Sequence, residues 1–517
     1  MLKKNGFTLV EILGVILLIG ILLLLSFPPI MNQIRESSKD IDKATENLIY
    51  TATSSYLDKK VNDYPIVKGS VFCIPLQELV NSGDLDKNIT NTSSLKKVNL
   101  SKIVKAEIEN AANIDYSIVD ENNCQEKIQK PGYADKSGAS KPRLTGGMIA
   151  VKWHGSELVK ADTSQEWYNY TNLEWANVVL VTDTKRDDYK NALSGTNIKE
   201  EDILAYLVWI PRYKYKLFNV KATLSTPKEI EVVFEPANRG KSNGLMDGTY
   251  LTHPAFTYND KEIDGFWIGK FETTGTQVLP TIKPNLESLR GQNISTMFSM
   301  LQYFNNVIPY GLPETSDAHL IKNIEWGAVA YLSHSKYGKN EEIWMNPSNT
   351  FITGCAGTAA KVIRTSGCEH AYNTLNGGEA STTGNVYGVY DMSGGATEYV
   401  MGSMFNIGNV TINTSSSGFS QETIDYINMN KYINKYNYGT TSDDQLAYDR
   451  RILGDATGET RGWYDNYSNF LSTTNSWFYR GGQLSHSTSE GIGIFGFDQS
   501  PGHIDSYRGS RLTITGL

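Results

Sequence analysis

The sequence predicts an α+β protein in which a long N-terminal helix and a small β-layer precede a large, loop-rich domain. Three features lead to this prediction: an apolar run over residues 7–30, strand-like alternation between residues 98 and 118, and many Trp, Tyr, Gly and Asn residues over 144–517. At 517 residues the chain is longer than one ordinary domain, so we expect two or three domains.

Composition limits the class of protein. Hydrophobic residues make up 40% of the chain and aromatic residues 11%, which is enough to build real cores. The formal net charge of −8 is mild and spread along the chain, whereas a protein that coats nucleic acid shows a basic patch. We therefore expect no nucleic-acid partner for the large C-terminal domain.

The N-terminus has the pattern of a basic leader followed by a membrane helix. Residues 1–6 are MLKKNG, and the apolar run that follows is long enough to span a bilayer. Lys3 and Lys4 keep the start of the chain in the cytoplasm and send the remainder outward. A secretory signal peptide is the alternative, but the run is too long for one and no small-x-small cleavage site closes it. We expect a single-pass protein of the cell membrane with an extracellular head.

Glu11 is a carboxylate inside this apolar run, where burial costs roughly 3 kcal/mol or more unless the group is paired. Cleavage between Gly6 and Phe7 creates a suitable partner, the new α-amino group of Phe7. The stretch Gly6-Phe7-Thr8-Leu9-Val10-Glu11 resembles the prepilin peptidase site of type IV pilins and pseudopilins. This resemblance implies cleavage after Gly6, N-methylation of Phe7, and pairing of Glu11 with the amine of a neighbouring subunit. Prepilin peptidase and other pilin-like subunits are then partners, and the protein lies in the membrane or in a surface filament.

The apolar stripe continues beyond Pro29, which predicts a helix from Phe7 to Leu57 that is roughly 75 Å long at about 1.5 Å per residue. In the remainder of the chain, residues 205–211 and 265–272 are predicted as strands, and residues 286–305 and 325–335 as helices. We assign residues 1–6 to the leader, 7–60 to the transmembrane and assembly helix, 61–130 to a small pilin-like β region, 131–143 to a linker and 144–517 to the head.

The four cysteines fall into two pairs, Cys73 with Cys124 and Cys355 with Cys368. No CxxC occurs and no histidine stands at zinc-finger spacing, which disfavours a zinc site. In an exported protein the pairs favour two disulfides, and four buried free thiols are the alternative.

Three groups of motifs in the head occur in an order that resembles one family. They are VWIPR at 208–212 with FWIGKFETT at 266–274, IEWGAVAY at 324–331 with YGVYDMSGGATEYV at 387–400, and WFYRGG at 477–482 with RGSRL at 508–512. Over roughly residues 200–517 the chain is similar to the formylglycine-generating enzymes, also called sulfatase-modifying factors. This resemblance implies a C-type-lectin-like fold for the head.

The chain departs from that family where the chemistry takes place. The enzymes use a cysteine pair near the C-terminus to bind copper and perform the oxidation, and here no cysteine follows Cys368. We therefore expect the fold without the enzyme activity, and no required cofactor. Glu398 stands where the family has the glutamate of a calcium loop, although Gly395 replaces the loop asparagine. The sequence allows two roles for Glu398. It can bind calcium, or it can accept hydrogen bonds from backbone N–H groups of its loop.

Residues 483–507 form a polar and aromatic segment between the Arg480 and Arg508 motifs. Its Ser, Tyr and Gly residues are types that adaptable binding loops use. Some relatives of the family are binding proteins whose final segment is hypervariable, and this segment occupies the same place. The sequence allows two interpretations of this segment, a loop that contacts a ligand and an ordinary surface loop. The candidate ligand-binding residues are His486, Asp498, Gln499, His503, Asp505 and Tyr507.

Two classes of function follow. We expect a type IV pilin-like surface protein whose non-catalytic head binds a surface protein or glycan, as an adhesin does. The alternative is a minor pilin or pseudopilin that serves as a structural subunit of a secretion or DNA-uptake filament. An enzyme of the formylglycine-generating kind is disfavoured because its C-terminal cysteines are missing from the sequence.

Overall fold

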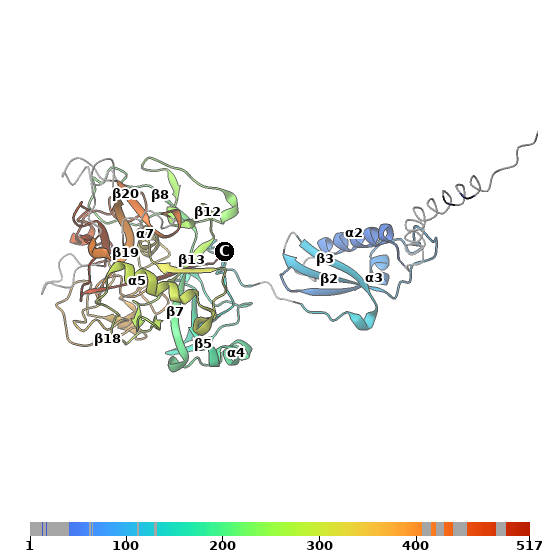
Figure 1. Cartoon of the computed structure of the whole chain (residues 1–517), viewed down its shortest axis with the longest axis horizontal. Coiled ribbons are helices and arrows are strands. Elements are labelled where there is room, and N and C mark those ends of the chain that lie inside the picture. The colour runs from blue at the N-terminus through green and yellow to red at the C-terminus, as the bar shows by residue number, and fades with distance from the viewer. Residues whose placement is uncertain are drawn as a thin grey trace, which may run out of the picture. The chain divides into compact units, whose positions relative to one another are not determined.

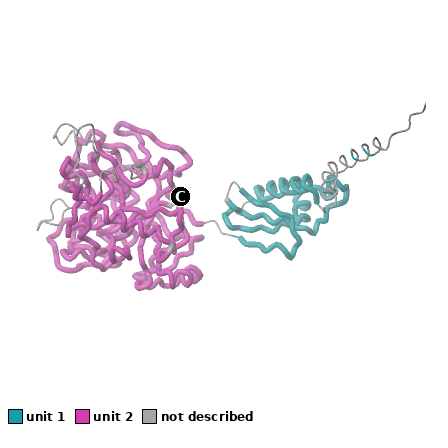
Figure 2. The backbone as a smooth tube through the Cα atoms, in the orientation of Figure 1, with its two compact units in different colours: residues 1–131 teal, residues 132–517 magenta. Residues whose placement is uncertain are grey.

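The computed structural model divides the chain into two compact units, residues 1–131 (unit 1) and 132–517 (unit 2), which Figure 2 shows in teal and magenta. The residues that it describes are 13, 17, 41–60, 64, 66–110, 113–128, 132–405, 415–419, 429–437, 452–481 and 493–516. The predicted membrane span lies outside these ranges, apart from residues 13 and 17. In the described ranges, no helix combines the length and the apolar character that crossing a membrane requires. Both units contain helices and strands, and the chain as a whole is a β-rich α+β protein with many loops.

Unit 1 is a helix packed on a small antiparallel sheet (Figure 1). Ile49 and Tyr56 of the helix share a core with Phe72, Ile74 and Val104 of the sheet. A disulfide between Cys73 and Cys124 joins the first strand to the segment after the third. The elements are α2 (Lys43–Lys59), β1 (Val71–Pro75), α3 (Leu76–Asn81), β2 (Ile103–Asn110), β3 (Asn113–Val119) and η1 (Glu121–Asn123), with the sheet order β1-β2-β3.

The helix α2 begins at Lys43, so the predicted continuous helix from Phe7 to Leu57 is wrong at this point. Asp42 has an extended backbone, and its Oδ1 accepts a hydrogen bond from the backbone N of Thr45 at 2.9 Å. Its Oδ2 accepts another from the backbone N of Ser93 at 2.6 Å. An N-cap of this kind satisfies the free N–H groups of a helix start and thereby begins a new helix.

Unit 2 is built around a seven-stranded antiparallel sheet. The C-terminal strand β24 lies inside this sheet rather than at its edge, because Ile514 pairs with both Trp267 and Ala318. Strand β7 confirms the strand predicted at 205–211, whereas the strand predicted at 265–272 is shorter and ends at Gly269. In spatial order the strands are β16 (Ser316–Leu320), β24 (Leu512–Gly516), β13 (Gly265–Gly269), β7 (Ile203–Pro211), β6 (Asn177–Val181), β4 (Met148–His154) and β5 (Glu157–Lys160).

A second sheet carries the C-terminal motifs. Its strands are β20 (Asn434–Asn437), β19 (Thr397–Phe405), β21 (Trp477–Arg480) and β22 (Phe497–Ser500), in that order, and β23 (Arg508–Gly509) pairs with β19. Smaller sheets are formed by β10 (Tyr250–Thr252), β8 (Tyr213–Lys216) and β9 (Val232–Phe234), by β11 (Thr257–Tyr258) and β12 (Lys261–Glu262), by β14 (Thr274–Gly275) and β15 (Pro280–Thr281), and by β17 (Cys355–Ala356) and β18 (His370–Ala371).

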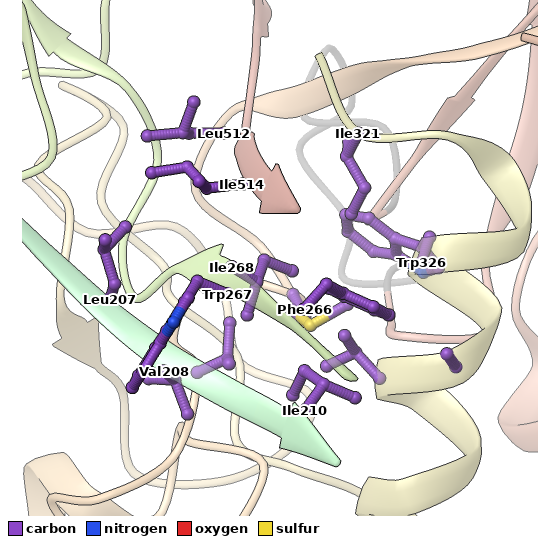
Figure 3. Close-up of a cluster of buried hydrophobic side chains, with 14 of the residues drawn as sticks. Leu207, Val208, Ile210, Phe266, Trp267, Ile268, Ile321, Trp326, Leu512 and Ile514 are labelled. Carbon is purple, nitrogen blue, oxygen red and sulfur yellow. The ribbon is translucent and has the colours of Figure 1, made fainter. Parts of the chain in front are cut away.

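The helix α7 (Asn323–Ser333) lies in the core of unit 2, and all of its residues are buried. Trp326 of this helix lies near Phe266 of β13 and Ile321 in the close-up of Figure 3. The predicted helix over 286–305 is shorter than expected, because Asn293 caps α5 (Ile294–Leu301) and residues before it are not helical. Further α-helices in the described part of the unit are α4 (Asp183–Asn191), α6 (Val307–Tyr310), α8 (Leu375–Gly378) and α10 (Met429–Tyr432).

Residues 132–143, predicted to be part of a linker, belong to unit 2. The indole N–H of Trp267 donates to the carbonyl of Arg143 at 2.8 Å, and that of Trp209 donates to the carbonyl of Ser140 at 3.2 Å. Buried N–H groups need acceptors, and this segment supplies two of them. The prediction was therefore wrong here because it was based on local composition.

Candidate functional site

Some predicted site residues lie outside the described residues: Gly6, Phe7 and Glu11 of the processing site, and His486 of the C-terminal segment. The structure places the other five candidate ligand residues on β22 and on the loop that follows it. Asp498 and Gln499 are half-buried on β22. His503, Asp505 and Tyr507 lie on residues 501–507, which we call the β22–β23 loop.

The backbone of the β22–β23 loop is held by hydrogen bonds from outside it. Ile294 N donates to the carbonyl of Gly502 at 3.2 Å, and Gly291 N donates to the carbonyl of Asp505 at 3.1 Å. The hydroxyl of Tyr399 donates to the carbonyl of His503 at 2.9 Å. These contacts fix the path of the loop, so it does not have to be ordered when a ligand binds.

Arg508 holds the end of the β22–β23 loop through three side-chain contacts. Its Nη1 donates to the Tyr399 hydroxyl at 2.9 Å and to Ser500 Oγ at 2.8 Å, and it lies 3.0 Å from Asp505 Oδ2. The other carboxylate oxygen of Asp505 accepts the backbone N of Tyr507 at 2.8 Å. Asp505 is therefore a structural residue of the loop.

The side chains of the loop differ in their exposure. Ile504 is 65% exposed and Tyr507 is 41% exposed. His503 Nε2 lies 3.9 Å from Asp505 Oδ2, and the His503 side chain is about half exposed. The β22–β23 loop thus has a fixed backbone and presents His503, Ile504 and Tyr507 to solvent.

Glu398, the predicted calcium ligand, is fully buried on β19 and forms an ion pair with Arg511. Arg511 Nε donates to Glu398 Oε2 at 2.9 Å, and Arg511 Nη2 donates to Glu398 Oε1. Two more guanidinium N–H groups donate to the carbonyls of Gly269 and Tyr390, each at 2.9 Å. Because both carboxylate oxygens face a cation of the protein, Glu398 does not fit a calcium ion. The partner is a side chain rather than the backbone N–H groups of the loop.

Two further buried carboxyl groups, those of Glu272 and Asp391, lie near the Glu398–Arg511 pair. Glu272 Oε1 accepts Ala396 N at 2.8 Å, and Asp391 Oδ2 accepts Gly354 N at 2.9 Å. Burial raises the pKa of Asp391 to about 6 and that of Glu398 to about 7, against the lowering effect of Arg511. Burial, and then the charges of Asp391 and Glu398, raise the pKa of Glu272 well above its ordinary value. Over the described ranges, no group of three or more His, Cys, Asp or Glu residues is arranged to hold a metal ion.

Gly395 stands where the calcium loop of the resembled family has asparagine, and the structure gives a physical reason for glycine. Its φ of +67° is in the left-handed region. A Cβ at this position would also collide with the carboxylate of Glu272. The buried carboxyl group therefore occupies the space that a side chain would need.

The cysteines are paired as Cys73–Cys124 and Cys355–Cys368. The second disulfide closes the segment between β17 and β18, which carries Arg364. Arg364 and Arg290 both lie over the ring of Phe351, which is near Tyr507 of the β22–β23 loop. Sequence reasoning missed these three residues, because no motif marks them and they come from separate segments.

A pocket of about 470 Å³ was also not predicted. Three aromatic side chains, Trp153, Tyr206 and Tyr372, line it together with Glu157, Glu200 and Asn285. Tyr206 donates a hydrogen bond from its hydroxyl to Glu200. Burial raises the pKa of Glu200. These residues come from distant parts of the sequence, so their proximity could not be inferred from any local pattern.

Comparison with known proteins gives a match at the N-terminus. Residues 1–27 match the prokaryotic N-terminal methylation motif, so the chain has a type IV pilin-like N-terminus. No curated protein matches the chain. A solved structure titled "Major Tropism Determinant I1 Variant" is similar over 81% of this chain and 81% of that chain, with 11% sequence identity and a TM-score of 0.27. A score of this size does not establish a shared fold, and the C-type-lectin-like fold of the head stays a prediction. The N-terminal motif is typical of membrane-anchored or filament-forming proteins that are cut by prepilin peptidase and associate with other pilin subunits.

Proposed function

We propose that the chain is a type IV pilin-like surface protein whose unit 2 is a non-catalytic head that binds a ligand outside the cell. The observation that carries this proposal is the β22–β23 loop, whose backbone is fixed while His503, Ile504 and Tyr507 face solvent. A loop that is already ordered binds a partner with a smaller loss of conformational entropy. The methylation motif supplies the means of placing such a head at the surface.

A structural role in a filament is the second candidate. Unit 1 favours it, because its helix-on-sheet core and its disulfide belong to a unit that is separate from unit 2. In this case unit 1 and the segment with the methylation motif carry out assembly, and unit 2 binds no ligand.

Deletion of residues 132–517 separates the two roles. Cells that carry the full chain are compared with cells that carry residues 1–131, and both filament formation and attachment to host or abiotic surfaces are measured. If the truncated chain still forms filaments but the cells no longer attach, the head binds the ligand. If filaments disappear and purified full chain attaches to no surface, the binding role fails and the structural role gains.

A point variant narrows the test to the loop. Tyr507→Ala removes the exposed ring of the β22–β23 loop, and Tyr303→Ala is its matched control because Tyr303 is a similarly exposed tyrosine of η6 (Gln302–Asn305). We expect weaker attachment with Tyr507→Ala and unchanged attachment with Tyr303→Ala. Equal attachment by both variants would remove the loop from the proposed function.

A further inference from the structure

Two arginine side chains converge on one aromatic ring beside the β22–β23 loop. The guanidinium carbon of Arg290 lies 3.8 Å from the centroid of the Phe351 ring, and that of Arg364 lies 5.7 Å from it. The ring of Tyr507 is 6.0 Å from the same ring. Phe351 is buried, whereas Tyr507 is exposed. The four residues therefore form a cationic and aromatic surface that includes a residue of the loop.

The chain holds this arrangement in place from several sides. Arg290 Nη1 donates to the carbonyl of Ser506 in the loop. Asn349 N donates to the carbonyl of Thr365 at 2.9 Å, and Thr365 N donates to the carbonyl of Pro347 at 3.1 Å, so the backbone next to Arg364 is tied to the backbone near Phe351. The disulfide between Cys355 and Cys368 closes the segment that carries Arg364.

Arg364 has no acceptor in the part of the chain that the structure describes. Its Nε and Nη2 atoms are shielded from solvent and make no hydrogen bond. Burial lowers the pKa of Arg364 to about 10, so the group keeps its charge at neutral pH. A guanidinium group that is partly removed from water without an acceptor is unfavourable until an anion supplies one.

Among the described residues, the carboxylates near this surface contact an arginine other than Arg364 or are buried. Asp505 pairs with Arg508 at 3.0 Å, and Glu287 is an exposed residue whose Oε2 lies 3.8 Å from Arg290 Nη2. Glu272 is buried and has a strongly raised pKa, so it adds little negative charge. Among the described residues around this surface, the arginines Arg290, Arg364 and Arg508 thus face the carboxylates of Asp505 and Glu287, in a chain whose formal net charge is −8.

We propose that Arg290, Arg364, Phe351 and Tyr507 form a binding site for an acidic sugar of a surface polysaccharide. The planar guanidinium group of Arg364 matches the geometry of a carboxylate or sulfate group. Arg290, which already donates to the carbonyl of Ser506, adds a second positive charge beside it. Tyr507 provides an exposed aromatic face for the sugar ring, and His503 provides a polar group for its hydroxyls. This inference rests on the proposed function of unit 2 as a ligand-binding head and names the chemical class of the ligand.

The test measures binding of the purified full chain in detergent to four immobilised polymers: dextran sulfate, polygalacturonate, neutral dextran and polyglutamate. Dextran and dextran sulfate share a backbone and differ in charge, and polyglutamate carries charge without sugar. We expect binding to the two acidic polysaccharides, weaker binding to polyglutamate, and none to dextran. Raised salt should weaken the binding, because the recognition is charge-assisted.

Variants locate the site. Arg364→Gln should weaken binding of dextran sulfate and polygalacturonate about tenfold or more, which is the range expected for loss of a charge-assisted hydrogen bond. Arg364→Lys should give an intermediate affinity, because a point charge cannot form the two parallel hydrogen bonds. Arg239→Gln is the matched control, since Arg239 is an exposed arginine of η4 (Ala237–Arg239).

Three outcomes would overturn the inference: no binding of either acidic polysaccharide by the unmodified chain, equal affinity of Arg364→Gln and Arg239→Gln, or binding of polyglutamate as tight as that of the polysaccharides. Unfolding temperatures of the variants show whether a loss of binding is a loss of fold. If attachment of cells still depends on residues 132–517 while Arg364→Gln keeps full affinity, the sugar site fails and the proposed function stands.

Discussion

Arg511 and Glu398 form a bidentate ion pair in which both side chains are fully buried. Arg511 lies between β23 and β24, and Glu398 lies on β19, so the pair joins the C-terminal strand of the large sheet to the second sheet. The same guanidinium group also donates to the carbonyl groups of Gly269 and Tyr390. The Arg511 guanidinium group thus connects several elements of unit 2. Replacing Arg511 therefore tests how much this buried group contributes to the stability of the unit.

Arg511→Met should destabilise unit 2 strongly. The substitution leaves Glu398 buried beside Asp391 without a counter-ion, and loss of one partner of a buried ion pair costs about 3–5 kcal/mol. Chemical denaturation followed by near-ultraviolet circular dichroism measures this loss. Arg239→Gln, which removes an exposed arginine, is the control and should leave the free energy of unfolding nearly unchanged. A loss below about 1 kcal/mol for Arg511→Met would contradict the role of the pair.

The stability of unit 2 should fall as pH rises from about 7 to 8.5. A carboxyl group whose pKa is raised on folding contributes stability that is fully present below its unfolded-state pKa of about 4 and is lost as pH rises through its folded-state pKa. Burial raises the pKa of Glu398 and of Glu459 to about 7, so this pH window covers their loss of protons. At pH 7 each of the two groups keeps about half a proton, so together they give a slope on the order of 1 kcal/mol per pH unit, which fades to zero by about pH 8.5.

Buried histidines act in the opposite direction, but at lower pH. Burial lowers the pKa of His253 to about 3 and that of His334 to about 4, so their contribution grows as pH rises towards their unfolded-state pKa of about 6.5 and is then complete. The carboxyl groups therefore set the slope above about pH 7. Denaturant titrations at several pH values measure it, and a constant free energy of unfolding from pH 7 to 8.5 would contradict the prediction.

Glu459→Gln should reduce this pH dependence while keeping the fold. Glu459 Oε2 accepts hydrogen bonds from the hydroxyls of Tyr215 and Tyr331 and from Gly454 N, and an amide oxygen can accept the same bonds. The variant removes one titrating group and should flatten the slope between pH 7 and 8.5. The matched control is Glu201→Gln, because Glu201 is exposed and should not change the slope.

Tyr399→Phe should loosen the β22–β23 loop. The substitution removes the hydroxyl that donates to the carbonyl of His503 and accepts from Arg508. Loss of such buried hydrogen bonds costs about 1–3 kcal/mol, and we expect faster backbone hydrogen exchange at residues 501–507. Tyr310→Phe is the control, since its hydroxyl donates to the carbonyl of Pro280 away from the loop. Unchanged exchange in the Tyr399 variant would show that the other backbone contacts alone hold the loop.

Reduction of the disulfides should affect unit 1 more than unit 2. The bond between Cys73 and Cys124 spans 51 residues, and that between Cys355 and Cys368 spans 13 residues. Loop-closure entropy then gives about 4 kcal/mol for the first and about 3 kcal/mol for the second, and unit 1 is much the smaller unit. Thermal unfolding with and without reductant measures both transitions, with Cys→Ser pairs as the control for side effects of the reductant. A larger loss in unit 2 would contradict this order.

Several elements could be predicted because their signals are local. The apolar run at 205–211 and the first five residues of the run at 265–272 form strands, and the EWGAVAY motif lies in the buried helix α7. The predictions that failed depended on context. A helix-compatible stripe continues through Asp42, but its carboxylate also meets Ser93 and caps a new helix. The Lys-, Pro- and Ser-rich composition near residue 140 suggested a linker, yet two buried tryptophans use its carbonyl groups as acceptors.

The N-terminal processing and assembly motif follows from the amino-acid sequence alone, because its glycine, its basic leader, its apolar run and Glu11 are contiguous. The role of Glu398 does not follow from the sequence, since its partner Arg511 is 113 residues away and no local pattern links the two. The arginine and aromatic surface beside Tyr507 likewise depends on contacts such as that of Arg290 with Ser506, 216 residues apart. The sequence shows which residues carry a charge. Whether a charged side chain is paired with a counter-ion or is available to a ligand depends on how distant segments pack.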